Sequence, residues 1–348
     1  MATDRMAAVA DPEALAQFRR RIEPLGLSPL WERATPQRPG GPCVPMIWRY
    51  GELRPHLIAA CELITKRAAE RRVLVFENPG LNGAGYATAT LYAGMQIIMP
   101  GEIAPSHRHS QNALRLFLEG EGAYTTVAGE RATMRPGDFV VTPAWAWHDH
   151  GNLGSGPCVW LDGLDTPFAQ FFGAIFREDA NAETQAMTRA AGDAAARYGA
   201  AMLPVDFQPP GPGAASPILV YRYEHSRAAL TQLARGAALH PVHGAKLRYA
   251  NPANGRHPFP TMAVFMQLLP KGFSGAPIRS TDGTVFTAVE GSGSVTIGET
   301  RFDFVARDSF AVPAWSRYRF EAAEECVLFS YSDRAAQEAL GFYREELG

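Results

Sequence analysis

The feature that most constrains this chain is a pattern of residues that occurs twice along its 348 positions. The first copy contains Met-Gln, a glycine and Glu-Gly-x-Gly, and the second copy contains them again 171 residues later. After a one-residue deletion the match continues through an aspartate and Pro-Ala-Trp. Matches at so steady an offset predict two copies of one domain. The matching pairs are Met95 and Met266, Gln96 and Gln267, Gly101 and Gly272, Glu119 and Glu290, Gly120 and Gly291, Gly122 and Gly293, Asp138 and Asp308, Pro143 and Pro313, Ala144 and Ala314, and Trp145 and Trp315.

Each copy consists of short apolar segments with turn residues between them. The first copy reads VLVF, LYAGMQIIM, ALRLFL, AYTTVA, DFVVT and CVWLDGL, and the second returns to this texture from Thr261 to about Tyr331. Many short segments rich in Val, Ile, Leu and Phe, bounded by turn residues, are typical of the strands of a barrel or sandwich. The chain's 33 glycines and 27 prolines supply such turns. We therefore expect an all-β core.

The segments outside the two copies have helical character, so the sequence predicts four parts. These are an N-terminal helical arm at 1–72, a first β-domain at 73–165, a helical linker and connecting segment at 166–260, and a second β-domain at 261–348. Periodic apolar residues and Ala-rich stretches favour helices in these outer segments. Within them, helical structure is expected at 12–24, 52–70, 166–202, 223–239 and 333–346.

Composition excludes several classes of protein. A net charge of −2 gives no attraction to nucleic acid or to an anionic membrane. No apolar stretch approaches the roughly 18 residues of a membrane span, and the N-terminus has no signal-peptide core. The four cysteines are scattered without a CxxC pair, which argues against disulfides and a thiolate metal site. We therefore expect a cytoplasmic protein.

Three histidines of the first copy have the spacing of a metal site. His107 and His109 are two residues apart, and residues i and i+2 of a strand project from the same face. His148 follows on a later segment and completes a set of three nitrogen ligands, which leaves other coordination positions open. Imidazole suits iron, zinc, copper or nickel, so the ligands alone do not name the metal. The alternative is that these are ordinary core histidines.

The second copy has lost these ligands. Alignment places Ile278, Ser280 and Tyr318 where the first copy has its three histidines. We therefore expect one metal ion per chain, in the first β-domain, and a structural or oligomerisation role for the second.

The combination of the repeat, the His-x-His pair and the third histidine resembles the cupin superfamily. The resemblance covers both β-domains and implies a bicupin, with two double-stranded β-helix (jelly-roll) barrels. Many cupins have a glutamate ligand four or five positions after the second histidine, whereas this chain has Ala113 and Leu114 there. A metal without an anionic protein ligand keeps more positive charge and favours an anionic, chelating substrate.

A narrower resemblance extends over nearly the whole chain. The blocks HRHSQNALR and WHDHGN, together with the N-terminal segments PLWE, WRYGELRP and RVLVFENP, resemble gentisate 1,2-dioxygenases and the related salicylate dioxygenases. This resemblance implies a single Fe(II) and cleavage of a 2-hydroxybenzoate between its carboxyl-bearing and hydroxyl-bearing carbons. It also implies a homo-oligomer, commonly a homotetramer.

Several substrates and functions stay open at this point. Gentisate is the first choice of substrate, and a 5-substituted salicylate (amino, nitro or halogen), salicylate and 1-hydroxy-2-naphthoate are alternatives. Another cupin reaction, such as a β-diketone or thiol dioxygenase or an isomerase, is disfavoured because those families do not share the N-terminal segment and the Ala-Leu-Arg block. The non-enzymatic alternative is a ligand-binding bicupin.

Two polar residues of apolar strands are candidates for catalysis and substrate binding. Arg115 lies in ALRLFL, where a guanidinium needs an anionic partner, and its planar fork fits a substrate carboxylate. The alternative is a buried pair with an acidic residue. His150, two residues after His148, is expected to contact substrate oxygens or carry a proton. It could instead lie at the surface near a turn.

Three further residues have weaker support from the sequence. Asp162 in CVWLDGL is expected to hold His150 or Arg115 from behind, or else to be a turn residue. Gln96 is a candidate contact to substrate or oxygen, although its repetition as Gln267 favours a structural role. Arg72 is a possible carboxylate partner, from its own or a neighbouring subunit, or else a solvated residue.

Overall fold

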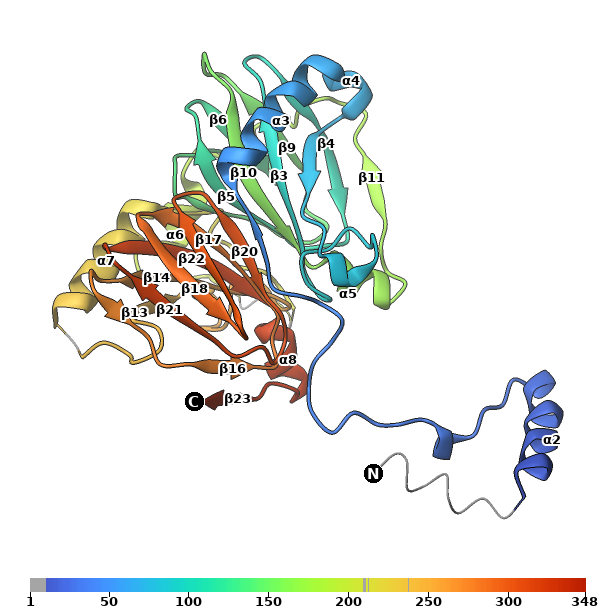
Figure 1. The fold of residues 1–348 in the computed structure, drawn as a ribbon. Helices are drawn as coiled ribbons and strands as arrows, with labels where there is room; N and C mark the ends of the chain where they lie inside the picture. The colour runs from blue at the N-terminus through green and yellow to red at the C-terminus, as the bar shows by residue number, and fades with distance from the viewer. Residues whose placement is uncertain (1–10, 209–210, 212, 237) are drawn as a thin grey trace. The chain divides into compact units, whose positions relative to one another are not determined.

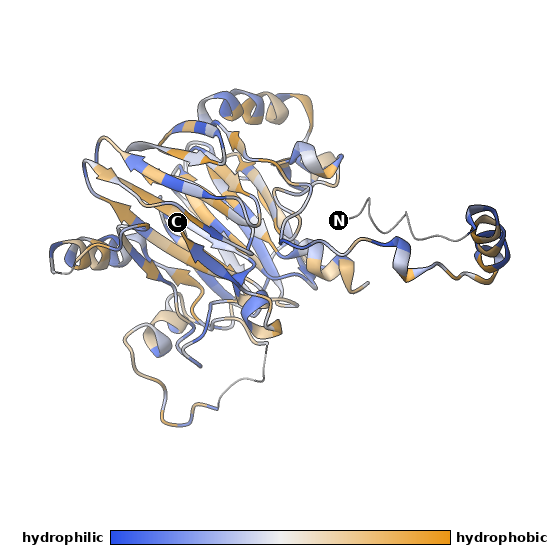
Figure 2. Ribbon diagram, turned by 60° about the horizontal axis from the view of Figure 1, so that its bottom comes forward, coloured by the Kyte–Doolittle hydropathy of each residue, from blue (hydrophilic) through white to orange (hydrophobic). Residues whose placement is uncertain are grey.

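The computed structural model describes residues 11–208, 211, 213–236 and 238–348, in two compact units whose boundary lies at Pro39/Gly40. In the first unit, Asp11 caps helix α2 (Pro12–Ile22) by accepting hydrogen bonds from the amides of Glu13 and Ala14. Two 3-10 turns, η2 (Glu23–Leu25) and η3 (Leu30–Glu32), follow. Figure 2 shows that α2 carries both hydrophilic and hydrophobic residues. Among the described residues, no helix is long and apolar enough to cross a membrane.

The second unit contains two jelly-roll barrels, as the repeat predicts (Figure 1). In the first barrel one sheet has the order β12-β8-β5-β10-β3-β2 and the other has the order β11-β4-β9-β6-β7, with antiparallel pairing throughout. Its strands are β2 (Arg72–Val75), β3 (Tyr92–Ile98), β4 (Ile103–His109), β5 (Ala113–Glu119), β6 (Ala123–Val127), β7 (Glu130–Thr133), β8 (Phe139–Thr142), β9 (His148–Asn152), β10 (Cys158–Leu164), β11 (Arg177–Asp179) and β12 (Val220–Tyr221).

The second barrel repeats this topology, except that two short strands take the place of β4. Its sheets have the orders β1-β20-β17-β22-β14-β13 and β19-β18-β21-β16-β23, with β15 paired to β21. Its strands are β1 (Met46–Trp48), β13 (Ala245–Arg248), β14 (Ala263–Leu269), β15 (Phe273–Ser274), β16 (Ile278–Ser280), β17 (Thr284–Glu290), β18 (Ser292–Ile297), β19 (Thr300–Val305), β20 (Ser309–Val312), β21 (Tyr318–Ala322), β22 (Cys326–Ser332) and β23 (Glu345–Leu347).

The two barrels exchange one edge strand each. Strand β1 precedes the first barrel in the chain but pairs with β20 of the second, and β12 precedes the second barrel but pairs with β8 of the first. Each exchanged strand runs directly into a helix, α3 (Tyr50–Leu63) or α7 (Tyr223–Gly236). The repeat therefore begins earlier than the sequence analysis recognised, with Trp-Arg-Tyr at 48–50 and Tyr-Arg-Tyr at 221–223.

The repeated carboxylates bind the start of each of these helices. The Tyr50 amide donates to Asp308 of the second barrel at 2.8 Å, and the Tyr50 hydroxyl donates to Glu119 of the first barrel at 2.6 Å. Arg54 donates to both oxygens of Glu119. The start of α3 is thereby held by both barrels, which explains why Glu119 and Asp308 belong to the repeated pattern.

The same contacts recur at α7. The Tyr223 amide donates to Asp138 of the first barrel at 3.0 Å, while the Tyr223 hydroxyl and Arg227 donate to Glu290 of the second. Arg222 adds an ion pair with Asp138 at 2.5 Å. Both helix starts are therefore bound to carboxylates of both barrels.

One hydrophobic core is continuous through both barrels. Met95 and Leu161 of the first barrel belong to the same cluster as Met266 and Phe329 of the second, and Leu57 of α3 and Leu230 of α7 join it. The barrels therefore bury apolar surface against each other, in addition to the separate clusters inside each barrel.

Two other repeated residues are required by backbone geometry. A Cβ on Gly120 would lie 2.5 Å from the Pro157 carbonyl oxygen, and one on Gly291 would lie 2.2 Å from the Glu325 carbonyl oxygen. Both glycines also have positive φ angles, of 100° and 71°. Only glycine fits where these backbone segments of the chain cross so closely.

Some helices are shorter than the sequence predicts. The expected helix at 52–70 is two helices, α3 and α4 (Lys66–Ala69), separated where Thr65 caps α4. The helical expectation for 166–202 is wrong for most of its length. Only α5 (Thr166–Phe171) and α6 (Asp193–Tyr198) are helical, and β11 between them pairs with β4, so tertiary pairing overrides the alanine-rich propensity.

At the C-terminus, α8 (Arg334–Leu340) ends at Gly341 in a left-handed conformation, and β23 then pairs with β16. A helix to residue 346 is therefore wrong. The four-part division at residues 72, 165 and 260 stays a prediction, because edge strands from outside each β-domain complete its sheets.

We expect Asp308→Ala to lower the free energy of unfolding by about 1–3 kcal/mol, because it leaves the Tyr50 amide buried without an acceptor. Urea unfolding followed by circular dichroism measures this loss. Asp138→Ala, at the equivalent position, should have a similar effect, whereas Asp303→Ala on the exposed face should have little. Equal unfolding midpoints for all three variants would contradict the role of these carboxylates.

Candidate metal centre

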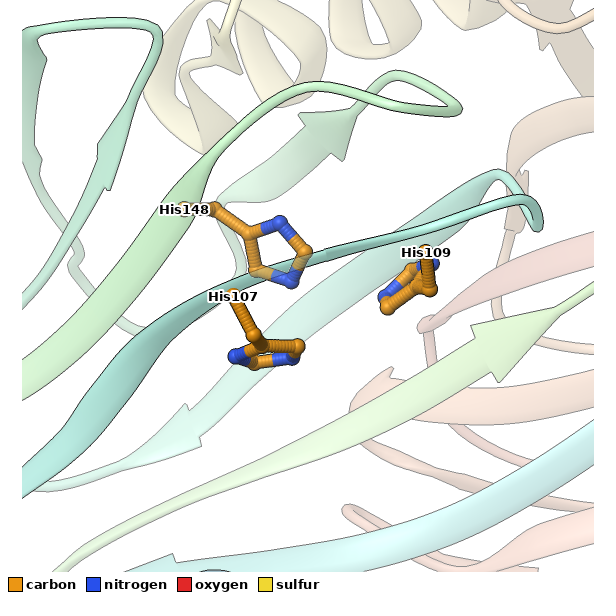
Figure 3. Close-up of side chains that lie close together, drawn as sticks. All are labelled: His107, His109 and His148. Carbon is orange, nitrogen blue, oxygen red and sulfur yellow. The ribbon is translucent and has the colours of Figure 1, made fainter. Parts of the chain in front are cut away.

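Antiparallel strands β4 and β9 bring three imidazoles together inside the first barrel (Figure 3). His107 lies directly opposite His148 in the register of this pair, and His109 follows two positions along β4. The ring centroids of His107 and His148 are 4.3 Å apart, and those of His109 and His148 are 4.8 Å apart. The structure therefore brings together the three histidines that the spacing predicts.

Each imidazole is oriented by a backbone carbonyl. The Nδ1 atoms of His107, His109 and His148 lie 2.8, 2.9 and 2.8 Å from the carbonyl oxygens of residues 105, 111 and 146. A carbonyl only accepts, so each Nδ1 carries the proton and each Nε2 has a free lone pair. This arrangement fixes the tautomer that binds a metal.

The three Nε2 atoms have no hydrogen-bond partner within the described part of the chain, although all are buried. One ligand nitrogen of each histidine lies within 4.8 Å of the ligand nitrogens of the other two. Burial, together with Arg71, lowers the pKa of His107 to about 3 and that of His109 to about 4. Burial also lowers the pKa of His148 well below its ordinary value, so all three rings are neutral near pH 7.

Core histidines normally satisfy both ring nitrogens, so three converging unpaired nitrogens fit a metal ion better than simple packing. A buried site with three neutral nitrogen donors could hold a divalent transition metal, and the donors leave other coordination positions open.

A cavity of about 570 Å³ reaches His109 from outside the barrel. Its wall combines cationic, acidic and apolar side chains, so it is suited to an organic anion. The residues that line it include Arg71, Tyr92, Arg115, Asp162, Ile175 and Phe176. We call this space the metal-side cavity.

Arg115 lines the metal-side cavity and is also paired with an acidic residue. It lies opposite Asp162 in the β5–β10 register, with Nε 3.1 Å from Oδ1, and its Nη1 donates to Thr142 at 2.6 Å. Asp162 also accepts from the Trp160 indole at 3.1 Å. The buried pair left open by the sequence therefore exists, and Asp162 holds Arg115 as predicted while one side of the guanidinium faces the cavity.

Arg72 does not lie in the cavity, and its neighbour Arg71 does. The Arg72 Nη1 donates to both oxygens of Glu102 at 2.7 Å, and its Nε donates to the Ile64 carbonyl. Arg71 lines the cavity and makes no ion pair with another described residue. Adjacent side chains near a strand point to opposite faces, so Arg71 faces the cavity and Arg72 faces Glu102, and the predicted substrate contact of Arg72 stays a prediction.

His150 is fully buried, so the alternative of a surface histidine is wrong. Neither of its ring nitrogens has a described partner, and its ring lies 5.6 Å from that of His148 and 5.9 Å from that of Trp160. Burial and the charge of Arg115 lower its pKa well below the ordinary value. It is therefore a neutral base beside the metal ligands.

Gln96 is buried on β3, opposite Val73 of β2 and Trp160 of β10. Its predicted contact with substrate stays a prediction. Trp145 has a structural role, because its φ of 63° turns its amide to donate to the carbonyl of His109 at 2.8 Å. Trp315 repeats this turn with a φ of 61°.

The segment that forms the outer wall of the cavity was not predicted from the sequence. Ile175 and Phe176 follow α5, and Arg177 begins β11, which pairs with His109. The only signal was a cluster of aromatic residues at 168–176 within a segment assigned to helix.

The second barrel has an apolar interior where the first has its site. Ile278 pairs with Tyr318 as His107 pairs with His148. Phe286 and Phe320 hold the positions of Arg115 and His150, with ring centroids 5.3 Å apart. Within the described residues, one cluster of three possible metal ligands is present.

Comparison with known proteins identifies relatives over nearly the full length. Residues 94–163 match the Cupin domain family. The chain is 48% identical to gentisate 1,2 dioxygenase 1 of Aquipseudomonas alcaligenes, over 94% of this chain and 95% of that one. It is 33% identical to 5-aminosalicylate 1,2-dioxygenase of a Comamonas species, over 87% and 81%. The crystal structure of a salicylate 1,2-dioxygenase from Pseudaminobacter salicylatoxidans superposes with a TM-score of 0.90 at 33% identity, covering 97% and 99%.

We expect His107→Ala to remove one of three metal donors and to lower bound metal from about one ion per chain to almost none. Elemental analysis after dialysis against excess metal measures this content. His225→Ala, at a side chain that is 81% exposed, is the matched control and should retain full metal. Undiminished metal in the His107 variant would rule out this centre.

Proposed function

The chain belongs to the gentisate and salicylate 1,2-dioxygenase family and is a ring-cleaving dioxygenase, and we propose that it opens gentisate to maleylpyruvate with one Fe(II) per chain. The observation that carries the proposal is the set of three unpaired imidazole nitrogens beside a cavity with cationic walls. The breakdown of aromatic compounds is the corresponding physiological role.

Gentisate is the preferred substrate because relatives at 48%, 36% and 36% identity are named gentisate 1,2-dioxygenases. A solved relative, the salicylate 1,2-dioxygenase of Pseudoaminobacter salicylatoxidans, is also described with gentisate bound. The alternatives are salicylate, 5-aminosalicylate, 5-nitrosalicylate and 1-hydroxy-2-naphthoate, which other relatives' names contain.

Iron is the metal that fits both the donors and the reaction. Zinc binds imidazole equally well but has no redox chemistry. Bound by His107, His109 and His148, Fe(II) would supply open coordination positions and electrons for oxygen chemistry. The neutral donors leave the full charge of the ion available to an anionic chelating substrate.

The chain's own residues position the substrate. We assign the carboxylate of the 2-hydroxybenzoate to Arg71, whose guanidinium lines the metal-side cavity without an acidic partner. Burial lowers the pKa of Arg71, and an anionic ligand offsets this cost. Arg115, fixed in place by Asp162 and Thr142, also lines this cavity.

His150 is the group that would move a proton. Both of its nitrogens are unpaired and its ring is neutral, so it can accept the proton of the substrate hydroxyl and return it to product. The short distance between its ring and that of the metal ligand His148, 5.6 Å between centroids, supports this role.

We also propose that the enzyme is a cytoplasmic homotetramer, as the family resemblance implies. No hydrophobic residue of the described part of the first unit, 11–39, is buried. Leu25, Leu30 and Trp31 are more than half exposed, and a neighbouring subunit would cover such a surface.

Oxygen uptake after anaerobic Fe(II) loading tests the function. We expect rapid uptake with gentisate and a new ultraviolet absorbance from the ring-opened keto acid, with slower reaction of salicylate and the 5-substituted salicylates. A faster reaction with one of the alternatives would change the assigned substrate. Iron-loaded enzyme that consumes no oxygen with any 2-hydroxybenzoate would refute the proposal.

We expect Arg71→Ala to keep its iron and to lose about 10- to 100-fold in kcat/KM, mostly through KM, since a hydrogen bond to a charged group contributes about 1.5–3 kcal/mol. Steady-state oxygen uptake measures both constants. Arg67→Ala, exposed on α4, is the matched control. An unchanged KM in the Arg71 variant would assign the carboxylate to another residue.

A further inference from the structure

The second barrel has a cavity of its own, of about 300 Å³. Strand β13, the loop before it and the start of α8 form most of its wall. Among the described residues, its polar side chains are cationic or imidazole groups, and none of those that line it is acidic. The residues that line it include His240, His243, Lys246, Phe265 and Arg334. We call this space the second-barrel cavity.

The second-barrel cavity is the counterpart of the metal-side cavity. Lys246 lies opposite Gln267, as Val73 lies opposite Gln96 in the first barrel. Arg334 follows the buried Asp333 at the end of its barrel, as Thr166 follows the buried Asp165. The equivalent pairs of lining residues are Val73 with Lys246 and Thr166 with Arg334, and Phe265 replaces Gly94. The second barrel has therefore lost its metal ligands but kept an opening on the same side.

Lys246 is the cation of this opening that lacks a partner. Its ammonium lies 4.6 Å from the centre of the Phe265 ring and 6.0 Å from that of Phe286, and it makes no ion pair within the described part of the chain. Burial lowers the pKa of Lys246 to about 8, so the amine is still mainly protonated at pH 7. An unpaired cation in such a place is costly, and an anionic ligand offsets the cost.

A second unpaired group lies beside Lys246. Gln267 is fully buried, and neither its amide nitrogen nor its amide oxygen has a described partner. It faces the same side of the sheet as Lys246, directly across the β13–β14 pair. Buried amides are normally hydrogen-bonded, so this pair of neighbours indicates a polar ligand.

The rest of the wall selects a flat molecule. The His240 and His243 rings are stacked 4.9 Å apart, and Phe265 presents a third ring. The Arg334 guanidinium already lies within 3.2 Å of the Glu338 and Glu345 carboxylates, which neutralise its charge. Arg334 therefore helps to orient a ligand but adds little positive charge to the cavity. Arg248 also lines the cavity, but it is exposed and donates to the Gly255 carbonyl, so Lys246 is the cation that lies among the aromatic faces. Such a site fits a monoanion with a ring better than a multiply charged phosphate.

We propose that the second-barrel cavity binds a small aromatic carboxylate, with the carboxylate on Lys246 and the ring against Phe265, without metal and without turnover. The choice of an aromatic acid rests on the proposed function, since substrate-like acids would be present wherever the enzyme acts. A cavity of this size accommodates a single-ring acid.

Binding stoichiometry tests the proposal. Salicylate is titrated anaerobically into the iron-loaded enzyme, and bound ligand per chain is measured by equilibrium dialysis. We expect Lys246→Met, which keeps the apolar stem, to bind one salicylate fewer per chain than wild type, with kcat for the ring-opening substrate unchanged. Lys246→Arg should restore the lost site. Lys271→Met, on the exposed surface of the same barrel, should bind as wild type does.

The same stoichiometry in wild type and Lys246→Met would overturn the proposal. So would displacement of this salicylate by an equal concentration of inorganic phosphate, because the site would then be a general anion site. The result is separable from the proposed function. An absence of oxygen uptake refutes the dioxygenase assignment, whereas the difference between wild type and the Lys246 variant depends on the second barrel alone.

Discussion

The antiparallel pairing of β4 with β9 is the contact on which the chemistry of this chain depends. It places His107 opposite His148 on the interior face of the barrel, and the period of two along β4 adds His109. A slip of one residue in this register would turn the imidazoles outward. The backbone carbonyls that hold the three Nδ1 protons lie in β4 or two residues beyond the end of β4 or before the start of β9, so the pairing sets the positions and the tautomers together.

The sequence predicted the parts of the molecule that follow strand periodicity. The two barrels and the histidine set follow from alternation along strands and from the repeat, whereas the pairing of Arg115 with an acidic residue was an alternative to the predicted substrate contact. The structure and role of residues outside regular strands were harder to predict. The choice between Arg71 and Arg72 depends on where β2 begins, and the segment at 166–202 has helical propensity that pairing with β4 overrides. The similarity of residues 48–50 to residues 221–223 was present in the sequence and would have revealed the longer repeat.

The two barrels show how one framework supports two interiors. The residues that both copies share are carboxylates, glycines and the tryptophan turn, and they hold helix starts, close backbone crossings and strand ends. The residues of the metal site are among those that differ. In the first barrel the three histidines keep unpaired ring nitrogens, which stability alone does not favour, and in the second barrel Phe286 and Phe320 replace Arg115 and His150 and pack against each other. The difference separates the part of the sequence selected for function from the part selected for folding.

The exchange of β1 and β12 also constrains how the chain is made. During synthesis from the N-terminus, the outer edge of β8 stays unpaired until residue 221 has been made, and β1 waits for β20 at residues 309–312. Until then, each sheet presents open backbone groups to other chains. A ribosome that pauses between the barrels therefore exposes an unfinished sheet, so the hazard of aggregation for this protein is concentrated in the middle of translation.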